Sequence, residues 1–234
     1  MKKLILLIAT ILVFTRLSAQ TSLFNDLLQA HVTKDGIVDY ASFNNEKLDA
    51  YLSYLEKTAP EASWSDNKQK AFWINAYNAY TIKKILESYP LKSITDIKEN
   101  GKTVWKIPFA KVGGETYTLD YVEHEILRKK LFDPRIHVGL NCAANSCPKL
   151  ENVAFTETNI EATLENLMKT FINDTTSNKI AKHNIQISSI FNWFQKDFTK
   201  SNTLISYLNK YSETKINSDS KISYLKYDWS LNGK

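Results

Sequence analysis

Residues 71–80 read AFWINAYNAY and form the most apolar part of a segment, residues 67–88, that has the spacing of a helix. Ser65 or Asp66 can start this helix, because their side chains can accept hydrogen bonds from the free backbone N–H groups of the first turn. Pro90 ends it, since proline does not allow a helix to continue. Apolar side chains cover most of the circumference, and a helix of this kind is buried on several sides. We therefore predict that it is the central helix of the fold.

Two amide side chains interrupt the apolar surface of this helix. Asn75 and Asn78 are three residues apart, so they share a face. Amides on a buried helix must find hydrogen-bond partners. One interpretation is that they tie the helix to backbone groups in the core. The other is that they line a cleft, where they orient a histidine or hold a substrate carbonyl.

The segments on either side alternate between helical and strand patterns, with no internal repeat. Helical spacing of apolar residues predicts helices over residues 23–32, 40–57, 118–130, 156–172, 188–198 and 202–211. Strand patterns predict a hairpin of residues 103–109 and 115–119 around Gly113-Gly114, a short strand at 135–141, a hairpin at 179–187 and a closing strand at 222–229. The sum predicts an α+β fold, a single domain with several helices packed on a small antiparallel sheet.

The composition agrees with a globular domain. The 234 residues are 43% hydrophobic and 24% charged, which excludes a disordered, collagen-like or coiled-coil chain. The net charge is +5, but three of the cations lie in the first 20 residues, which contain no acidic residue. The remainder is close to neutral. Because no stripe of Lys and Arg with interleaved aromatics is present, we expect no nucleic-acid partner.

The first 20 residues, MKKLILLIATILVFTRLSAQ, have the pattern of a secretory signal peptide. Two lysines precede an apolar run, and Ala19 gives a small residue at the expected cleavage point. We expect a signal peptide at residues 1–19 and a single mature domain at 20–234, exported to the periplasm or the extracellular space. An uncleaved membrane anchor is the alternative, although the apolar run is short for a span of ~20 residues. No transmembrane segment is expected in the mature protein.

The two cysteines of the chain lie in NCAANSCP, residues 141–148. A local disulfide between Cys142 and Cys147 is one interpretation, since export favours oxidation. The other is that Cys142 is a nucleophile at the end of a strand, with a thiolate stabilised by its surroundings. We expect no metal site, because two thiolates at this spacing would need two further ligands. No cofactor is predicted.

Two histidines lie near the cysteines in sequence. His137 precedes Cys142 by five residues, and His124 lies between two glutamates on the predicted helix at 118–130. Either could be the base of a catalytic triad, with Glu123 or an asparagine as the group that orients it. Strand alternation would direct His137 and Cys142 to opposite faces, so that pair would need a bulge or turn. Arg128 either forms a structural ion pair or belongs to the same site.

Several segments together resemble the DUF547 family, a family of unknown function. The segments that carry the resemblance are residues 71–79, Val122-Glu123-His124 with Ile126-Leu127-Arg128, residues 133–138, Cys142 with Ser146-Cys147-Pro148, and residues 227–232. The resemblance extends over about residues 65–232. It implies a shared site made of Cys142, His137, His124, Glu123, Arg128, Asn75 and Asn78. It also implies that the second cysteine is replaceable by Ser or Asp, which weakens the disulfide as the reason for Cys142.

A distant likeness to papain-like or transglutaminase-like folds is a further expectation. Those folds place the nucleophilic cysteine at the start of the central helix, whereas here Asn75 lies where one would be sought. A conventional papain-type mechanism is therefore not expected.

The leading hypothesis is a thiol-dependent hydrolase or acyl transferase. Cys142 would be the nucleophile, and His124 or His137 would be the base. Glu123 would complete the catalytic group, while Asn75, Asn78 and Arg128 would bind substrate. The alternative is a non-catalytic binding module for a peptide, glycan or lipid head group, with Cys142 and Cys147 in a structural disulfide. The expected partner is a small molecule, a peptide or a glycan.

Overall fold

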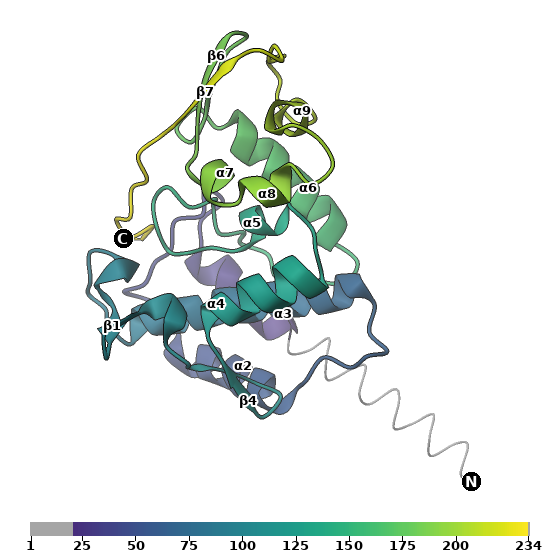
Figure 1. The fold of residues 1–234 in the computed structure, drawn as a ribbon. Helices are drawn as coiled ribbons and strands as arrows, with labels where there is room; N and C mark the ends of the chain where they lie inside the picture. The colour runs from purple at the N-terminus through teal and green to yellow at the C-terminus, as the bar shows by residue number, and fades with distance from the viewer. Residues whose placement is uncertain (1–20, 234) are drawn as a thin grey trace.

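Helix α3 (Asp66–Leu86) runs through the middle of the molecule in the computed structural model, which describes residues 21–233 (Figure 1). The Ser65 hydroxyl caps it by accepting from the Lys68 N–H group at 3.2 Å. The residues from Lys70 to Ile82 are all buried. The prediction of a central helix is confirmed, and the sequence signals gave its ends to within two residues. The predicted signal peptide at residues 1–19 lies outside the described residues.

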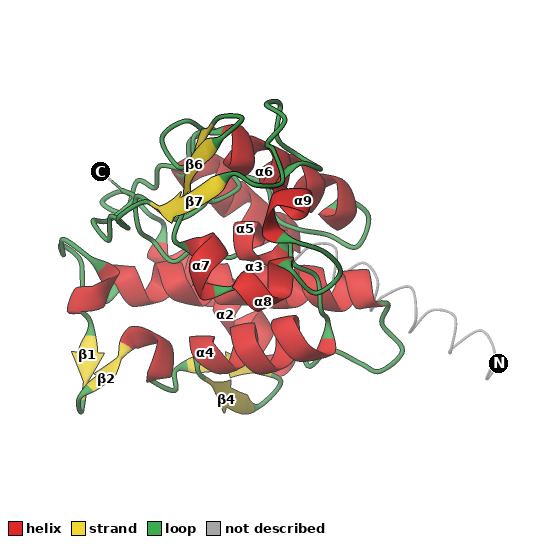
Figure 2. Cartoon of the chain, turned by 45° about the horizontal axis from the view of Figure 1, so that its top comes forward, coloured by secondary structure: helices red, strands yellow, loops and turns green. Residues whose placement is uncertain are grey.

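Helices and small strands cover α3 on several sides (Figures 1 and 2). Residues 21–31 are helical and precede α2 (Asn45–Lys57), which begins at the cap Asn44. Helix α3 packs against α2, α6 (Ile160–Asn173), strand β3 (Ala110–Val112) and the helix η3 (Val122–Lys130). The fold therefore places one apolar helix at the centre of the core. None of the helices within residues 21–233 is both long and apolar enough to cross a bilayer.

Within residues 21–233 the named strands form three small sheets. Strand β1 (Lys98–Glu99) pairs with β2 (Lys102–Thr103), and β3 pairs with β4 (Glu115–Tyr117) across the Gly113-Gly114 turn. In the third sheet, β5 (Lys179–Ile180) pairs antiparallel with β6 (Asn184–Ile187), and β6 pairs parallel with β7 (Lys221–Tyr224). The parallel pair forms because the chain returns through the short helices α7 (Ile190–Trp193), α8 (Gln195–Phe198) and α9 (Leu204–Leu208). The predicted α+β class and single domain are confirmed.

Two of the predicted strands are wrong in detail. Residues 135–141 contain the one-turn helix α5 (Ile136–Gly139) instead of a strand. All residues from 136 to 141 are buried, so the alternation of apolar and polar types does not mark an inner and an outer face. In the run 103–109, residues Val104–Lys106 form the 3₁₀ turn η2, which follows a second such turn, η1 (Ile94–Asp96).

The predicted helix at 118–130 is present, but it is mostly a π-helix. The one-turn helix α4 (Leu119–Tyr121) starts at the cap Thr118, and η3 continues it as a π-helix over Val122–Lys130. Its end shows the wider spacing, because the Leu131 N–H group donates to the Ile126 carbonyl five residues earlier at 3.0 Å. Helices of this type are rare and occur frequently at functional sites. Hydrophobic spacing does not distinguish them from α-helices of the same length.

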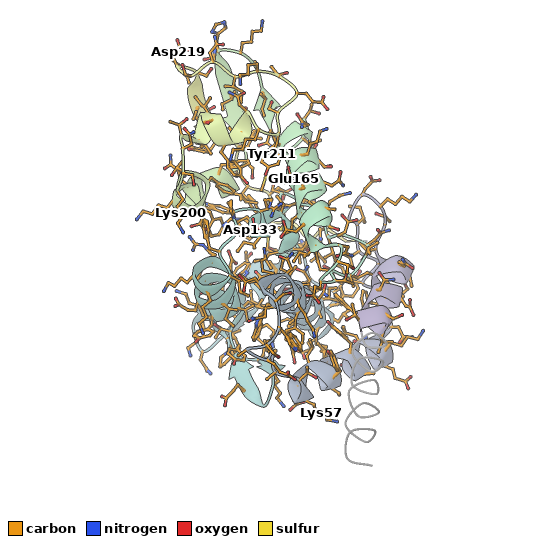
Figure 3. All side chains as sticks on the ribbon, turned by 90° about the vertical axis from the view of Figure 1, so that its right-hand side faces the viewer. Lys57, Asp133, Glu165, Lys200, Tyr211 and Asp219 are labelled. Carbon is orange, nitrogen blue, oxygen red and sulfur yellow. The ribbon has the colours of Figure 1, made fainter. Side chains whose placement is uncertain are left out.

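A network of ion pairs fixes the start of α5 between α3 and α6. The buried Asp133 accepts from Arg135 at 2.8 Å and from Lys70 at 3.3 Å. Arg135 also contacts Glu165 at 3.1 Å, and Tyr211 donates to the same carboxylate (Figure 3). Burial raises the pKa of Asp133, but the hydrogen bonds from Arg135 outweigh it and the pKa lies below its usual range. The chain is therefore anchored directly before the turn that carries His137.

Candidate functional site

The loop that contains Cys142 follows α5 directly and is held by amide side chains. Asn78 on α3 donates to the Gly139 carbonyl at 2.9 Å and accepts from the Asn141 N–H group at 2.9 Å. The Asn141 side chain accepts in turn from the Ala143 N–H group at 2.9 Å. Ala143 has a φ of 56°, in the left-handed region, so the chain turns sharply just after the cysteine. Asn78 is therefore a positioning residue for the backbone that leads into Cys142.

The C-terminal segment, residues 227–233, lies against the same loop. Asn145 and Ser146 donate their N–H groups to the carbonyls of Ser230 and Asp228 at 2.8 and 3.1 Å. The Ser146 hydroxyl accepts from the Asp228 N–H group at 2.9 Å. These bonds bring the Tyr227 hydroxyl to 3.2 Å from the Cys142 sulfur. A segment 85 residues away in sequence thus supplies a hydrogen bond to the thiol.

Cys142 and Cys147 are both free thiols in this structure, so the alternative disulfide is not formed in it. The Cys142 N–H group donates to the Cys147 sulfur at 2.9 Å. A hydrogen bond from the Cys147 thiol lowers the pKa of Cys142, and this outweighs burial, which acts in the opposite direction. Hydrogen bonds from Tyr227 and from the Ala144 N–H group also lower it. Burial raises the pKa of Cys147. Cys142 is the more acidic thiol of the pair.

His137 lies in the core between two carboxylates. Its side chain is 2% exposed and stacks on Phe194, with the ring centroids 3.9 Å apart. The Nε2 atom lies 2.8 Å from Asp197 Oδ2, and the Nδ1 atom lies 3.8 Å from Glu123 Oε1. Burial lowers the pKa of His137, so its neutral form is favoured.

Asp197, on α8, joins His137 to Arg128. Arg128 contacts this carboxylate with two nitrogens, at 2.6 and 3.1 Å. Burial raises the pKa of Asp197, but the hydrogen bonds from His137 and Arg128 outweigh it and hold the pKa below its usual range. The ionised Asp197 accepts the proton on His137 Nε2. In neutral His137 this leaves the Nδ1 lone pair directed at Glu123.

Glu123 is the carboxyl group of this cluster that titrates near neutrality. Burial raises its pKa to about 7, although Arg128 and a hydrogen bond from Tyr77 act in the opposite direction. A carboxyl group with this pKa is half protonated at neutral pH and can both donate and accept a proton there.

His124 has its tautomer fixed by Arg128. The guanidinium lies 2.9 Å from His124 Nδ1, and a guanidinium can only donate, so Nδ1 accepts. Neutral His124 therefore carries its proton on Nε2, which lies 4.0 Å from Asp120. Burial and the charge of Arg128 lower the pKa of His124. This histidine offers an N–H donor.

A cavity of about 180 Å³ joins these groups, and we call it the thiol cavity. Cys142, His137, His124 and Glu123 all line it, together with Cys147, Tyr77 and a set of apolar and aromatic side chains. Among the described residues, no hydrogen bond links Cys142 to a histidine. Arg128 and Asn78 lie behind the lining residues and hold them in place. Within residues 21–233, no three His, Cys, Asp or Glu side chains are grouped as a metal site.

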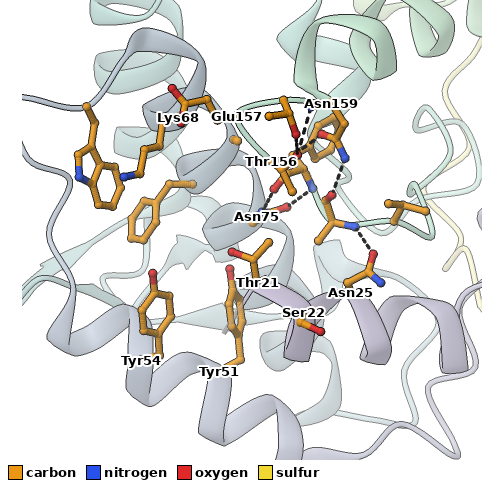
Figure 4. Close-up of a pocket in the computed structure, with 17 residues that line it drawn as sticks. Thr21, Ser22, Asn25, Tyr51, Tyr54, Lys68, Asn75, Thr156, Glu157 and Asn159 are labelled. Carbon is orange, nitrogen blue, oxygen red and sulfur yellow. Dashed lines mark hydrogen bonds between the residues drawn. The ribbon is translucent and has the colours of Figure 1, made fainter. Parts of the chain in front are cut away.

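Asn75 belongs to a different cavity, of about 590 Å³, which we call the large cavity (Figure 4). Its amide donates to the Phe155 carbonyl at 2.7 Å and accepts from the Phe155 N–H group at 3.0 Å. Figure 4 shows these bonds at the edge of the cavity, with Tyr51 and Tyr54 on α2 opposite. Asn75 and Asn78 both form hydrogen bonds to buried backbone groups, as expected if these amides connect α3 to the core.

No sequence pattern indicates Asp197 as a site residue. It lies 60 residues from His137, on a helix of four residues with no charge pattern of its own. Tyr227 lies in a segment that carries the family resemblance, but nothing there indicates a contact with the thiol. In the sequence, Tyr77 is only one of several aromatic residues on α3, and nothing indicates its contact with Glu123.

The comparison with known families agrees with the resemblance. Residues 62–172 match the family described as "Protein of unknown function, DUF547". These residues of the chain are therefore similar to the DUF547 family. The matched DUF547 segment includes α3, η3, α5 and both cysteines, whereas Asp197 and Tyr227 lie beyond it. No curated protein and no solved structure matches the chain. The distant papain-like or transglutaminase-like similarity stays a prediction.

Proposed function

We propose that this protein is a thiol-dependent hydrolase or acyl transferase with Cys142 as its nucleophile. The observation that carries the proposal is the placement of an acidified thiol in one small cavity with a carboxyl group that titrates at about 7. A lowered thiol pKa increases the fraction of the nucleophilic thiolate. A carboxyl group with a pKa near the working pH is suited to general acid and general base catalysis.

In the first step the Cys142 thiolate attacks the carbonyl carbon of an ester or amide. The carbon–sulfur bond forms, and the carbonyl π electrons move to the oxygen. His124 Nε2–H is the lining donor suited to that oxyanion, because Arg128 occupies the other ring nitrogen. Protonated Glu123 then gives its proton to the leaving oxygen or nitrogen as its bond to carbon breaks. The product of this step is a thioester on Cys142.

In the second step the Glu123 carboxylate takes a proton from water or from an acceptor alcohol or amine. The attacking atom forms its bond to the thioester carbon, and the carbon–sulfur bond breaks to release the Cys142 thiolate. Water gives a hydrolase, and another acceptor gives a transferase. Glu123 thus ends each cycle protonated, as it began.

His137 acts through Glu123 in this scheme and not on the thiol. Its Nδ1 atom faces the Glu123 carboxyl group at 3.8 Å, and Asp197 and Arg128 fix the ring from the other side. A neutral His137 provides an acceptor for the Glu123 proton and favours its protonated form. We assign His137 a positioning role.

The signal-like residues 1–19 support a second part of the proposal, that the protein acts after export from the cytoplasm. The thiol would then work in an environment where oxidation competes with catalysis. Labelling of the thiols in intact cells with a membrane-impermeant reagent tests this, and labelling only after lysis would contradict it.

Trapping of the acyl-enzyme tests the catalytic proposal. After brief incubation with p-nitrophenyl acetate and acid quenching, intact mass spectrometry should show one acetyl group, and peptide mapping should place it on Cys142. The variant Cys142→Ala should release nitrophenol at the rate of buffer and carry no acetyl group. The variant Cys147→Ser should still be acetylated. Equal acetylation of wild type and Cys142→Ala would overturn the proposal.

A binding role without catalysis is the second candidate, and one observation favours it. Trp193 borders the thiol cavity and is 48% exposed, so part of its indole ring is accessible to a ligand that enters the cavity. This candidate predicts a ligand that raises the melting temperature and is not consumed. Turnover of that ligand would argue against it.

A further inference from the structure

Four aromatic side chains form one continuous wall of the thiol cavity, which we call the aromatic wall: Trp105, Trp193, Tyr227 and Trp229. Trp193 stacks on Trp229 with the ring centroids 5.8 Å apart and the planes 18° apart. Tyr227 lies against both, at 4.8 and 4.6 Å. The Tyr227 hydroxyl also contacts the Cys142 sulfur. A group bound against the aromatic wall would therefore lie beside the thiol.

The lining of the same cavity has acidic side chains and no cation. Asp120 and Glu123 are its carboxyl groups, and none of the lining residues within 21–233 is a lysine or an arginine. Arg128, the nearest cation to these groups in the site, is held by two contacts to Asp197 and one to His124. An anionic ligand would thus enter a cavity that offers it the Asp120 carboxylate and aromatic faces. Both are unfavourable to a negative charge.

We infer that the thiol cavity recognises an alkylammonium group, with its positive charge against the aromatic wall and beside Asp120. Aromatic faces attract cations because of their negative ring quadrupole, and tryptophan is the strongest of them. Methylated ammonium groups lose little hydration on binding and are the common ligands of such aromatic surroundings. The inference rests on the proposed function and names its substrate class: an ester or amide that carries an ammonium group close to the carbonyl carbon.

The dimensions of the cavity agree with a small cationic group. A volume of about 180 Å³ has room for about six water-sized groups. A trimethylammonium group with a short linker is of that order. A larger substrate would extend outward over Trp193, the most exposed part of the aromatic wall.

A matched set of three probes separates the effect of ligand charge on binding from the effect of ligand shape. The three probes have nearly the same shape but differ in charge. Choline is the cation, dimethylbutanol is its uncharged isostere with carbon in place of nitrogen, and dimethylbutanoate is the anion. Each is added to the full protein, and the rate of Cys142 alkylation by iodoacetamide is followed by peptide mapping. We expect choline to protect Cys142, and the uncharged isostere to need about a tenfold higher concentration for the same protection. Equal or better protection by dimethylbutanol or dimethylbutanoate, or protection by none of the three, would overturn the inference.

Two pairs of variants locate the effect. Trp193→Leu and Asp120→Asn should each weaken the choline dissociation constant, measured by tryptophan fluorescence, by about three- to tenfold. Their controls remove the same groups elsewhere: Trp64→Leu in the large cavity, and Glu125→Gln on η3, whose carboxylate pairs with Lys129. The controls should bind choline as the wild type does. Equal weakening by a variant and its control would contradict the assigned position.

The variant Cys142→Ala separates this inference from the proposed function. It keeps the aromatic wall and Asp120, so it should bind choline with the wild-type dissociation constant although it cannot form a thioester. Choline binding by a protein whose thiol forms no acyl-enzyme would refute the proposed function and leave the ligand class standing. An acyl-enzyme without any preference for the ammonium probe would do the reverse.

Discussion

The thiol cavity and the large cavity both border α3, but they differ in volume and in the chemistry of the side chains that line them. The large cavity has about 590 Å³ and takes Lys68, Phe72 and Asn75 from one face of the helix. The thiol cavity has about 180 Å³ and takes Tyr77 from the other face. Among the described residues, the lining of the large cavity contains no cysteine or histidine, whereas the smaller one has two of each.

The reactive side chains that line a cavity, and not its volume, therefore identify the candidate site in this fold. Volume measures only the space that packing leaves unfilled. A buried carboxyl group that titrates at about 7 and an acidified thiol in one cavity need a specific arrangement of neighbours. That arrangement costs stability, and we expect such a cost to be retained where it supports function.

Among the substitutions that leave the Cys142 nucleophile in place, Glu123→Gln should slow turnover the most. If Glu123 is the general acid and base of the thiol cavity, the variant should lose about a hundredfold or more in the turnover of an activated ester. The inflection near pH 7 in the wild-type rate profile should also disappear. The matched control is Glu157→Gln, which removes a carboxylate from the large cavity and should leave the profile unchanged. An inflection near pH 7 that persists in Glu123→Gln would assign it to another group.

The substitution Glu123→Gln should also change how the free energy of unfolding depends on pH. The folded pKa of Glu123 is about 7, above the ordinary value of 4.5, so the folded state holds a proton that the unfolded state releases between these values. This group therefore makes the wild type less stable as the pH rises from about 4.5 to about 7, by on the order of 3 kcal/mol. Urea unfolding at pH 5 and pH 8 should show a smaller fall for Glu123→Gln than for wild type. Parallel curves for the two proteins would show that Glu123 titrates normally.

The two asparagines of α3 provide a paired test of the two cavities. Asn75→Ala and Asn78→Ala each remove two hydrogen bonds to buried backbone, so each should lower the free energy of unfolding by about 2–3 kcal/mol. Only Asn78→Ala should also slow the alkylation of Cys142, because Asn78 holds the turn before the thiol. Slower alkylation in Asn75→Ala to the same extent would mean that the loss is one of general stability.

Loss of the Cys147 hydrogen bond to the Cys142 thiolate should have the smallest effect of these changes. Cys147→Ala removes the hydrogen bond that lowers the pKa of Cys142, so the apparent pKa of Cys142 should rise. Cys147→Ser keeps a donor at this position and should change the apparent pKa less. Thiol alkylation rates across a pH series measure both. An unchanged apparent pKa in Cys147→Ala would leave Tyr227 and the Ala144 N–H group as the effective donors.

The features that could be predicted correctly from the sequence are those that depend on local patterns of residues. The apolar run at 71–80 and the cap Ser65 define α3, and the Gly113-Gly114 pair defines the β3–β4 turn. The resemblance named Cys142, Glu123, His124 and His137, and the structure brings all four to one cavity. The pattern failed at 135–141, where burial on all sides made a helical turn look like a strand.

The remaining features depend on contacts between segments far apart in the sequence. Asp197 reaches His137 only because α7 and α8 fold back over α5, and no local pattern on α8 indicates it. Tyr227 reaches the thiol because the C-terminal segment pairs with residues 143–146. The tautomer of His124 follows from its contact with Arg128, which depends on the geometry of η3.

The pH dependence of thiol alkylation shows whether the thiol cavity activates Cys142. Wild-type protein is treated briefly with iodoacetamide across a pH series, and peptide mapping follows Cys142 and Cys147 separately. We expect Cys142 to react first, with an inflection below that of an ordinary cysteine, while Cys147 reacts only at higher pH. Reaction of Cys147 before Cys142, or of both with the same ordinary inflection, would contradict the claim that the thiol cavity activates Cys142.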